Sequence, residues 1–347
     1  MSRPPLFPRK GGRRKPVRKD QGPLRTASRV LVTLALVLLV GGGWVFWTYS
    51  GPGPTARQGQ VTDIVLPHGA GVGQIASALK AAGVIGSREV FYLAAKLGGA
   101  GRHLKAGEYE FKSGQPMAEV LADIEQGKVV KRFVAVPEGF TSEMAADAVR
   151  AEPVLTGTVE TPPEGSLLPD SYQIERGEDR AAVVQKMRAA RDQLLAQLWA
   201  GRAADLPLKT PEEAVTLASI VEKETGVPSE RPRIAAVFEN RLRAGIRLES
   251  DPTIIYAITK GRPLGRGITR KELDTPTPYN TYAIAGLPPT PIANPGRASL
   301  AAVLNPPRSD EMFFVANGTG GHVFASTYAQ HAANVAKWRA IERARAK

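Results

Sequence analysis

The hydrophobic positions of the chain form one long continuous run, followed by many shorter periodic segments. From Val30 to Tyr49 the sequence VLVTLALVLLVGGGWVFWTY carries no charge, and about twenty apolar residues are enough to cross a bilayer as a helix. After this run, apolar positions alternate or recur at helical spacing, with Gly and Pro between the segments. The pattern predicts one transmembrane helix at 30–49, followed by a globular region of the α+β class.

The globular region begins with a segment, residues 61–130, that predicts a small α/β module. The expected elements, in chain order, are a strand at VTDIVLP, a helix at Val72–Ala82 ended by Gly83, a helix after the N-cap residue Ser87, a strand at GEYEF, and a helix at Met117–Glu125 ended by Gly127. Residues 50–60 contain GPGPTARQGQ, which is rich in turn residues and predicts a short flexible linker from the membrane to this module.

Two segments of the exported region resemble each other. IVLPHGAGVGQIA at Ile64–Ala76 and VAVPEGFTSEMAA at Val134–Ala146 both contain a strand pattern, Pro-x-Gly and a helix start. Two unrelated turns of similar chemistry would give the same match, so an internal repeat and a coincidence both remain open. Residues 131–342 alternate strands, helices and loops rich in Pro and Gly, and we expect them to form a larger mixed α+β domain.

The charge of the chain is concentrated at its N-terminus. The formal net charge is +13, of which residues 1–29 carry about +9. A basic segment before an apolar run predicts that the N-terminus is cytoplasmic and that everything after the run is outside the membrane. The sequence has no zinc-finger, homeodomain or RNA-recognition pattern, so nucleic acid is not an expected partner. It also contains no Cys, which excludes disulfides and thiolate chemistry.

A cleaved signal peptide is the alternative to an uncleaved anchor. Such a peptide has a short apolar core and a small-residue cleavage site. Ala56 is the only plausible site, and it lies far beyond the core of the apolar run. We therefore expect an uncleaved single-pass membrane anchor, with the folded region outside the cytoplasm.

One predicted helix carries acidic residues where apolar ones are expected. Thr210 can cap a helix that starts at Pro211 and ends before Gly226. On this helix Glu222 falls at the edge of the apolar face, where partial burial would raise a carboxyl pKa towards the range of a general acid. Glu224 also lies near that face and competes for the role. Alternatively, the EKE run is an ordinary surface with ion pairs to nearby arginines.

Other candidate residues follow this helix, and several chemistries are absent. Asp251 precedes a predicted helix, where it could be a cap, and the polar and aromatic residues of YNTY suit sugar recognition or loop packing. No GxxxxGK[ST], G-x-S-x-G or H-E-x-x-H motif occurs, which disfavours nucleotide hydrolases, serine hydrolases and zincins. The four His have no metal-ligand spacing, and NGTGGH around His322 predicts a hairpin turn.

Several separated motifs in one order resemble the YceG-like endolytic murein transglycosylases. They are EGSLLPDSY at Glu164–Tyr172, IVEKET at Ile220–Thr225, NRL at Asn240–Leu242, SDPT at Ser250–Thr253, YNTY at Tyr279–Tyr282, GLPP at Gly286–Pro289 and GGHVF at Gly320–Phe324. LKAGEYEF at Leu104–Phe111 resembles the LysM-like subdomain of that family. The chain departs from the pattern at Glu249, where Gln is common, and at Ser166, where an aromatic residue is common.

The resemblance implies a lyase with a single-pass anchor in the bacterial inner membrane and a catalytic domain that is periplasmic or otherwise extracytoplasmic. It would cleave the β-1,4 bond between N-acetylmuramic acid and N-acetylglucosamine in nascent glycan strands, leave 1,6-anhydro ends and so limit strand elongation, without a cofactor or a metal. It implies Glu222 as the catalytic residue, and a substrate groove lined by Asn240, Asp251, Tyr279, Asn280 and Tyr282. Peptidoglycan synthases of elongation or division are implied partners. A hydrolytic muramidase with a second carboxylate, and a non-catalytic peptidoglycan-binding scaffold, are the alternatives.

Overall fold

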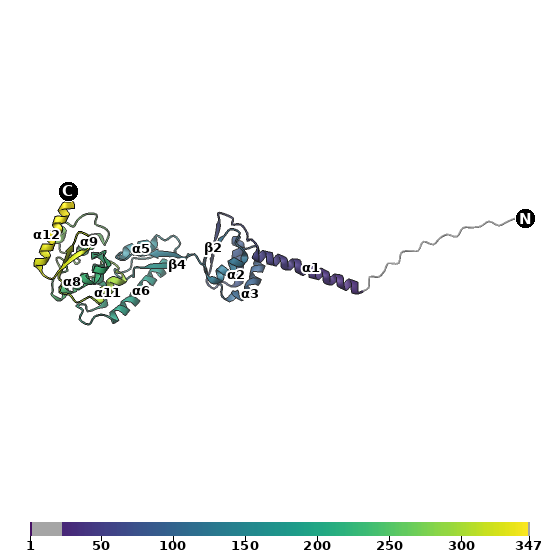
Figure 1. The fold of residues 1–347 in the computed structure, drawn as a ribbon, viewed down its shortest axis with the longest axis horizontal. Coiled ribbons are helices and arrows are strands. Elements are labelled where there is room, and N and C mark those ends of the chain that lie inside the picture. The colour runs from purple at the N-terminus through teal and green to yellow at the C-terminus, as the bar shows by residue number, and fades with distance from the viewer. Residues whose placement is uncertain (2–22, 346–347) are drawn as a thin grey trace. The chain divides into compact units, whose positions relative to one another are not determined.

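The computed structural model describes Met1 and residues 23–345, so residues 2–22 of the expected basic tail lie outside the described residues. Contacts within the chain divide it into two units, Met1–Val130 and Lys131–Lys347. Figure 1 shows the elements of each unit. Both units mix helices with short antiparallel strand pairs, in agreement with the expected α+β class.

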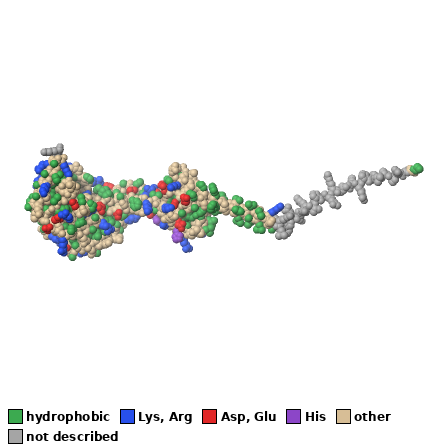
Figure 2. Space-filling model, viewed as in Figure 1, with side chains coloured by type: hydrophobic (Ala, Val, Ile, Leu, Met, Phe, Trp, Pro, Cys, Tyr) green, Lys and Arg blue, Asp and Glu red, His purple; other side chains and the backbone are tan. Residues whose placement is uncertain are grey.

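The first unit starts with a long apolar helix, α1 (Pro23–Ser50), which confirms a helix across the uncharged run. Its segment Ala27–Ser50 has a mean hydropathy of 2.3, and none of the most apolar stretch is buried. Hydrophobic side chains cover its visible surface in Figure 2. Without a membrane this exposed apolar surface would be unfavourable, so α1 is suited by length and composition to cross a bilayer. A signal sequence near the N-terminus meets the same description.

The rest of the first unit is a small two-layer module. Strands β1 (Val61–Leu66) and β2 (Gly107–Lys112) pair antiparallel, with Val61 opposite Lys112. The helices are α2 (Val72–Ala82), α3 (Arg88–Leu97) and α4 (Met117–Gln126), with the short 3-10 turn Ala100–Arg102 between α3 and β2. Their apolar faces enclose Phe91, Tyr109 and Phe111. The predicted cap is confirmed, because Ser87 Oγ accepts a hydrogen bond from the Val90 N–H at 3.3 Å.

The segment that we predicted to be a flexible linker is instead bound to the module. The Gly53 N–H donates to the Gly114 carbonyl at 3.0 Å, and the Gly114 N–H donates to the Pro54 carbonyl at 3.0 Å. A Cβ at Gly53 would lie 2.1 Å from the Gln115 carbonyl oxygen, so only Gly permits this close approach. Tyr49, at the end of α1, packs against the module core. The turn-rich composition of the segment therefore serves close packing of the backbone and not flexibility.

The second unit opens with the strand pair β3 (Arg132–Ala135) and β4 (Ser171–Ile174) and with helices α5 (Ser142–Arg150) and α6 (Arg180–Ala200). The two segments that resemble each other in sequence form the same local structure, a strand, a turn and a helix. Gly69 and Gly139 hold the same place in the two turns, and both have φ of +77°, a conformation that favours glycine.

A mainly helical core forms the remainder of the second unit. Its elements are α7 (Pro211–Glu224), the short 3-10 turn Pro228–Glu230, α8 (Arg231–Arg243), α9 (Asp251–Thr259), α10 (Arg270–Asp274), α11 (Arg297–Leu304), β5 (Phe313–Ala316), β6 (His322–Ala325) and α12 (Tyr328–Arg345). Helix α7 packs against α8 and α11, and α12 packs on the hairpin of β5 and β6. The hairpin predicted around NGTGGH is confirmed, since Ala316 pairs with His322 across its turn.

Candidate active site

Helix α7 positions the acidic residues that the sequence analysis singled out. Thr210 Oγ1 accepts a hydrogen bond from the Glu213 N–H at 3.2 Å, and Pro211 occupies the first turn, so the predicted start of the helix is confirmed. The residues from Ala214 to Val221 are all buried. The apolar ones among them pack in the main core of the unit. This rigid packing fixes the C-terminal turn of α7, which carries Glu222 and Glu224.

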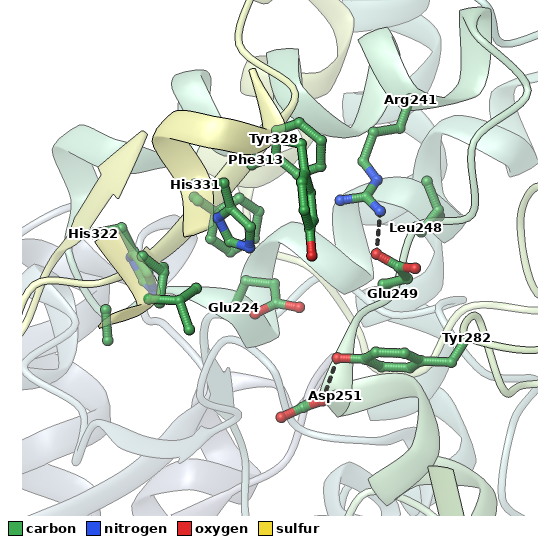
Figure 3. Close-up of a pocket in the computed structure, with 14 residues that line it drawn as sticks. Glu224, Arg241, Leu248, Glu249, Asp251, Tyr282, Phe313, His322, Tyr328 and His331 are labelled. Atoms are coloured by element: carbon green, nitrogen blue, oxygen red, sulfur yellow. Dashed lines mark hydrogen bonds and ion pairs between the residues drawn. The ribbon is translucent and has the colours of Figure 1, made fainter. Parts of the chain in front are cut away.

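A cavity of about 410 Å³ lies at the C-terminal end of α7 (Figure 3). It is lined by Glu224, Arg241, Leu248, Glu249, Asp251, Tyr282, Phe313, Phe314, Val315, Ala316, His322, Tyr328, His331 and Val335. Helices α7, α8, α9 and α12 and the β5–β6 hairpin each contribute part of this lining. The cavity is therefore assembled from segments that are more than a hundred residues apart in sequence.

Glu224 lies among charged, polar and aromatic side chains in this cavity, as Figure 3 shows. Its carboxyl group accepts a hydrogen bond from Ser250 Oγ. Burial raises the pKa of Glu224, the Ser250 hydrogen bond opposes this shift, and the negative charge of Asp251 adds a smaller increase, so that the pKa is about 7. Near neutral pH a large fraction of Glu224 is thus protonated and able to donate a proton.

Several other polar groups of the cavity have partners within the protein. The Tyr282 hydroxyl donates to Asp251 Oδ1 at 2.8 Å, and burial raises the pKa of Tyr282. The Arg241 guanidinium forms an ion pair with Glu249 and donates from Nε to the Arg247 carbonyl at 2.7 Å. Glu249 has φ of +54°, which is uncommon for a residue other than Gly. These pairs hold the side chains around Glu224 in fixed orientations.

Glu222, the predicted catalytic residue, lies outside the lining of this cavity. Its carboxylate accepts hydrogen bonds from Arg231 Nη2 at 3.1 Å and from the Gly296 N–H at 3.0 Å, and its side chain is only 5% exposed. Arg231 also contacts Glu138 at 3.3 Å. Glu222 therefore ties α7 to the start of α8 and to the loop before α11, in the manner of a structural ion pair.

Three of the five predicted groove residues also lie outside the cavity lining, whereas Asp251 and Tyr282 are part of it. Asn240 donates to the Ser309 carbonyl at 2.8 Å and to the Glu311 carbonyl at 3.0 Å. The buried Asn280 donates to the backbone carbonyls of the segment that precedes it. Tyr279 packs against Tyr256, with ring centroids 5.0 Å apart. In this structure these amide and aromatic groups hold loops in place.

Among the described residues, no group of three or more His, Cys, Asp or Glu is arranged to hold a metal ion. The carboxylates of the cavity each have a partner within the protein: Ser250 for Glu224, Tyr282 for Asp251 and Arg241 for Glu249. Glu224 thus stands out by its raised pKa, and its chemistry is that of a proton donor and acceptor.

The family model described as the YceG-like family matches residues 64–337. The chain belongs to the YceG-like family. Similar curated proteins of the family include the "Endolytic murein transglycosylase" of Bacillus subtilis strain 168, 27% identical over 85% of this chain and 89% of the relative. The protein of the same name from Streptococcus pneumoniae strain D39 is 28% identical over 87% of this chain, which spans only 63% of that relative.

A solved YceG-like structure extends the comparison to the fold. The crystal structure of a YceG-like protein from Listeria monocytogenes is 27% identical to this chain, with a TM-score of 0.51 over 79% of this chain and 98% of the other. The matched region spans both the small module and the unit that contains the cavity. The cavity around Glu224 thus belongs to the part of the chain that YceG-like proteins share.

Sequence reasoning about this YceG-like chain missed the wall of the cavity formed by α12. Tyr328, His331 and Val335 line the cavity from that helix. Their spacing of three and four residues places them on one helical face. This spacing was readable in the sequence. What the sequence could not show is that the face meets the end of α7, because that contact depends on the β5–β6 hairpin on which α12 packs.

Proposed function

We propose that this protein is an endolytic murein transglycosylase, a lyase that cleaves the β-1,4 bond between N-acetylmuramic acid and N-acetylglucosamine within glycan strands. Membership of the YceG-like family and similarity to endolytic murein transglycosylases of Bacillus subtilis and Streptococcus pneumoniae support this activity. The observation that carries the chemistry is the raised pKa of Glu224 inside a cavity lined by aromatic and polar groups. On this observation we propose Glu224 for the acid/base role, and Glu222, which the resemblance implies, is the competing candidate.

In the proposed reaction one carboxyl group acts twice. Protonated Glu224 donates its proton to the glycosidic oxygen as the bond from muramyl C1 to that oxygen breaks. The resulting carboxylate accepts the proton of the muramyl 6-hydroxyl while O6 bonds to C1 and closes the 1,6-anhydro ring. Glu224 ends protonated as it began, and no water is consumed. A carboxyl with a pKa of about 7 suits both proton transfers near neutral pH.

The decisive experiment compares two carboxamide variants of neighbouring residues. The full chain, purified in detergent, is incubated with uncrosslinked glycan strands, and the products are identified by mass spectrometry. We expect anhydro-muramyl ends from the wild type, and Glu224→Gln to lower the rate roughly 100- to 10,000-fold. Glu222→Gln should retain the wild-type rate of cleavage per folded molecule. The folded fraction of the variant is therefore measured alongside its rate. The opposite pattern would return the acid/base role to Glu222.

A hydrolytic muramidase is a second candidate, because Asp251 lines the same cavity as Glu224. A pair of carboxylates could activate water on the opposite face of the sugar. Reducing muramyl ends, with incorporation of labelled oxygen from water, would identify this activity. Binding of glycan strands without any cleavage by the wild type would instead indicate a scaffold protein.

We further propose that α1 anchors the protein in the inner membrane with its N-terminus in the cytoplasm. The length and hydropathy of Ala27–Ser50, and the basic residues before it, support this topology. A cleaved signal peptide would give a mature chain that lacks α1, and mass measurement of the membrane-extracted protein distinguishes the two.

For the small module we propose a LysM-like role in glycan binding. The order of its elements supports this, with α2 and α3 between the paired strands β1 and β2. Loss of glycan binding on deletion of residues 61–130 from the anchored chain would support the proposed role of the module.

We also propose peptidoglycan synthases as partners, because an anchored enzyme would act on glycan strands as they are made. Crosslinking in cells tests this partnership.

A further inference from the structure

Helix α3 of the small module presents large apolar side chains to solvent. Among residues 51–130, all of which the structure describes, three of the five large exposed apolar side chains lie on this helix. They are Tyr92, Leu93 and Leu97, and the two leucines are 49% and 79% exposed. Leu93 and Leu97 are four residues apart, so they share one face of the helix. Grouped apolar side chains on a surface commonly mark a site of interaction with a membrane or a protein.

The beginning of α3 lies beside the end of the apolar helix α1. A surface pocket is lined by Trp44 and Trp47 of α1 together with Ile85 from the loop before α3. A Cβ at Gly86, in the same loop, would lie 3.8 Å from Thr48 Cγ2. Helix α1 also contacts α3 itself, as Figure 1 shows. The module therefore reaches back along α1 to the level of Trp44 and does not start beyond the end of that helix.

The length of α1 determines where a bilayer surface would lie. About twenty residues cross the hydrocarbon core as a helix. Counted from Val30, which follows the last basic residue before the apolar run, twenty residues end at Tyr49. Trp and Tyr rings also favour the level of the lipid headgroups. When α1 spans a bilayer, the loop before α3 and the first turn of α3 thus lie at headgroup level.

The charged residues of α3 suit the same surroundings. Lys96 Nζ lies 5.1 Å from the centroid of the Tyr92 ring. A Lys side chain at a membrane surface can pack its aliphatic part along apolar groups and keep its ammonium among the headgroups. Arg88 and Lys96 outnumber Glu89, the one acidic residue of this helix. A helix with an apolar face and adjacent basic side chains is suited to lie in the plane of a membrane surface.

We propose that the exposed face of α3, formed by Tyr92, Leu93 and Leu97, inserts into the lipid surface of the membrane that α1 spans. This second contact would hold the small module against the bilayer and restrict it to glycan close to the membrane. The inference rests on the proposed anchor and is independent of the proposed cleavage reaction.

The absence of Cys from the chain allows a fluorescent label to be placed at one position at a time. The variants Leu93→Cys and Leu97→Cys place a bimane label on the α3 face, and Leu38→Cys places one within α1. Each full-length variant is reconstituted in vesicles of phosphatidylethanolamine and phosphatidylglycerol. Doxyl-labelled lipids quench labels that lie in the bilayer, and iodide quenches labels that lie in water.

Gln126→Cys is the matched control, at an exposed position of the same module. It lies at the C-terminal end of α4, whose first residue, Met117, lines the pocket beside Trp47. Nine residues of helix separate the two positions by about 13 Å. A label at 126 therefore reports on a part of the module that the proposal leaves in water.

We expect the labels at 93 and 97 to be quenched by the doxyl lipids, at a depth of roughly 5–10 Å below the headgroup boundary, and to be protected from iodide. The label at 126 should show the opposite behaviour. Adding Leu93→Gln to the Leu97→Cys chain should reduce the lipid quenching, because it removes apolar surface from the same helical face. Thermal unfolding of each labelled variant shows that the protein remains folded.

Two results would overturn the proposal. Iodide quenching at 97 equal to that at 126 would show that the α3 face lies in water. Protection of 97 from both quenchers would show that protein, either a second copy of this chain or a partner, covers the face. Absence of lipid quenching at 38 would overturn the anchor, and the labels at 93 and 97 would still decide whether α3 contacts lipid. The products of glycan digestion test the lyase separately.

Discussion

Glu222 and Glu224 are two residues apart at the end of α7, yet their carboxyl groups face different surroundings. Glu222 is held by Arg231 and by the Gly296 N–H, whereas Glu224 accepts a hydrogen bond from Ser250 and lines the cavity. Two residues correspond to about 200° around a helix, so the two side chains leave it on nearly opposite sides. The same short motif therefore provides a structural carboxylate and a candidate acid.

The first prediction concerns the pH dependence of cleavage. The pKa of Glu224 is raised to about 7, and the proposed first step requires its protonated form. We therefore expect kcat/KM to fall as the pH rises through about 7, with a slope of one proton. The measurement is a pH profile of anhydro-muramyl product formation on glycan strands. A rate that stays constant to pH 9 would contradict protonated Glu224 as the acid.

The second prediction is a pH-dependent gain in stability on neutralising Glu224. Its folded-state pKa of about 7 lies above 4.5, the ordinary value for Glu, so the folded protein binds this proton more tightly than the unfolded chain. The destabilising contribution of ionised Glu224 is therefore fully present above about pH 7. It decreases as the pH falls from about 7 to about 4.5, and it is absent at lower pH. Glu224→Gln should increase the free energy of unfolding by on the order of 2 kcal/mol at pH 8.

Urea unfolding of the variant and the wild type at pH 8 and at pH 4 measures this effect, because only the difference between the two pH values reports on the charge. Glu212→Gln, in the exposed first turn of α7, is the control and should change the free energy of unfolding by no more than a few tenths of a kcal/mol at either pH. An equal gain for Glu224→Gln at both pH values would show that packing, and not ionisation, accounts for it.

The third prediction tests the charge of Asp251. After burial and the opposing hydrogen bond from Ser250, this charge contributes to raising the pKa of Glu224. Asp251→Asn removes the charge and keeps an oxygen that can accept the Tyr282 hydrogen bond. We expect the alkaline limb of the kcat/KM profile to move to lower pH. Asp310→Asn, on an exposed loop, should leave the limb unchanged, and an unmoved limb in Asp251→Asn would remove Asp251 from this role.

The fourth prediction concerns the ion pair of Glu222. Both partners are mostly buried, with side-chain exposures of 5% for Glu222 and 13% for Arg231. Within the described part of the chain, Glu222→Gln would leave Arg231 with the more exposed Glu138 as its one acidic partner. We expect a loss of about 1 to 3 kcal/mol in the free energy of unfolding at neutral pH. Urea denaturation measures it, and a neutral effect would show that the pair contributes little to stability.

Most of the local structure was predictable because it depends on neighbouring residues. The caps at Ser87 and Thr210, and the glycine that ends α2, act within one turn of the residues they stabilise. The hairpin turn at NGTGGH is local in the same way. The segment 50–60 was misjudged, since Gly and Pro suit a flexible linker and a tightly packed one equally well.

The sequence by itself determined the apolar helix, the helix and strand order of the small module at residues 61–130 and a helix end rich in carboxylates. Only the tertiary structure decided which carboxylate enters the cavity. A helical wheel places both Glu222 and Glu224 near the apolar face of α7. The distinction comes from Arg231 and Gly296 on one side, and from Ser250 and the α12 wall on the other. Burial and partner charges are properties of contacts between distant segments, and these set the pKa values on which the chemistry depends.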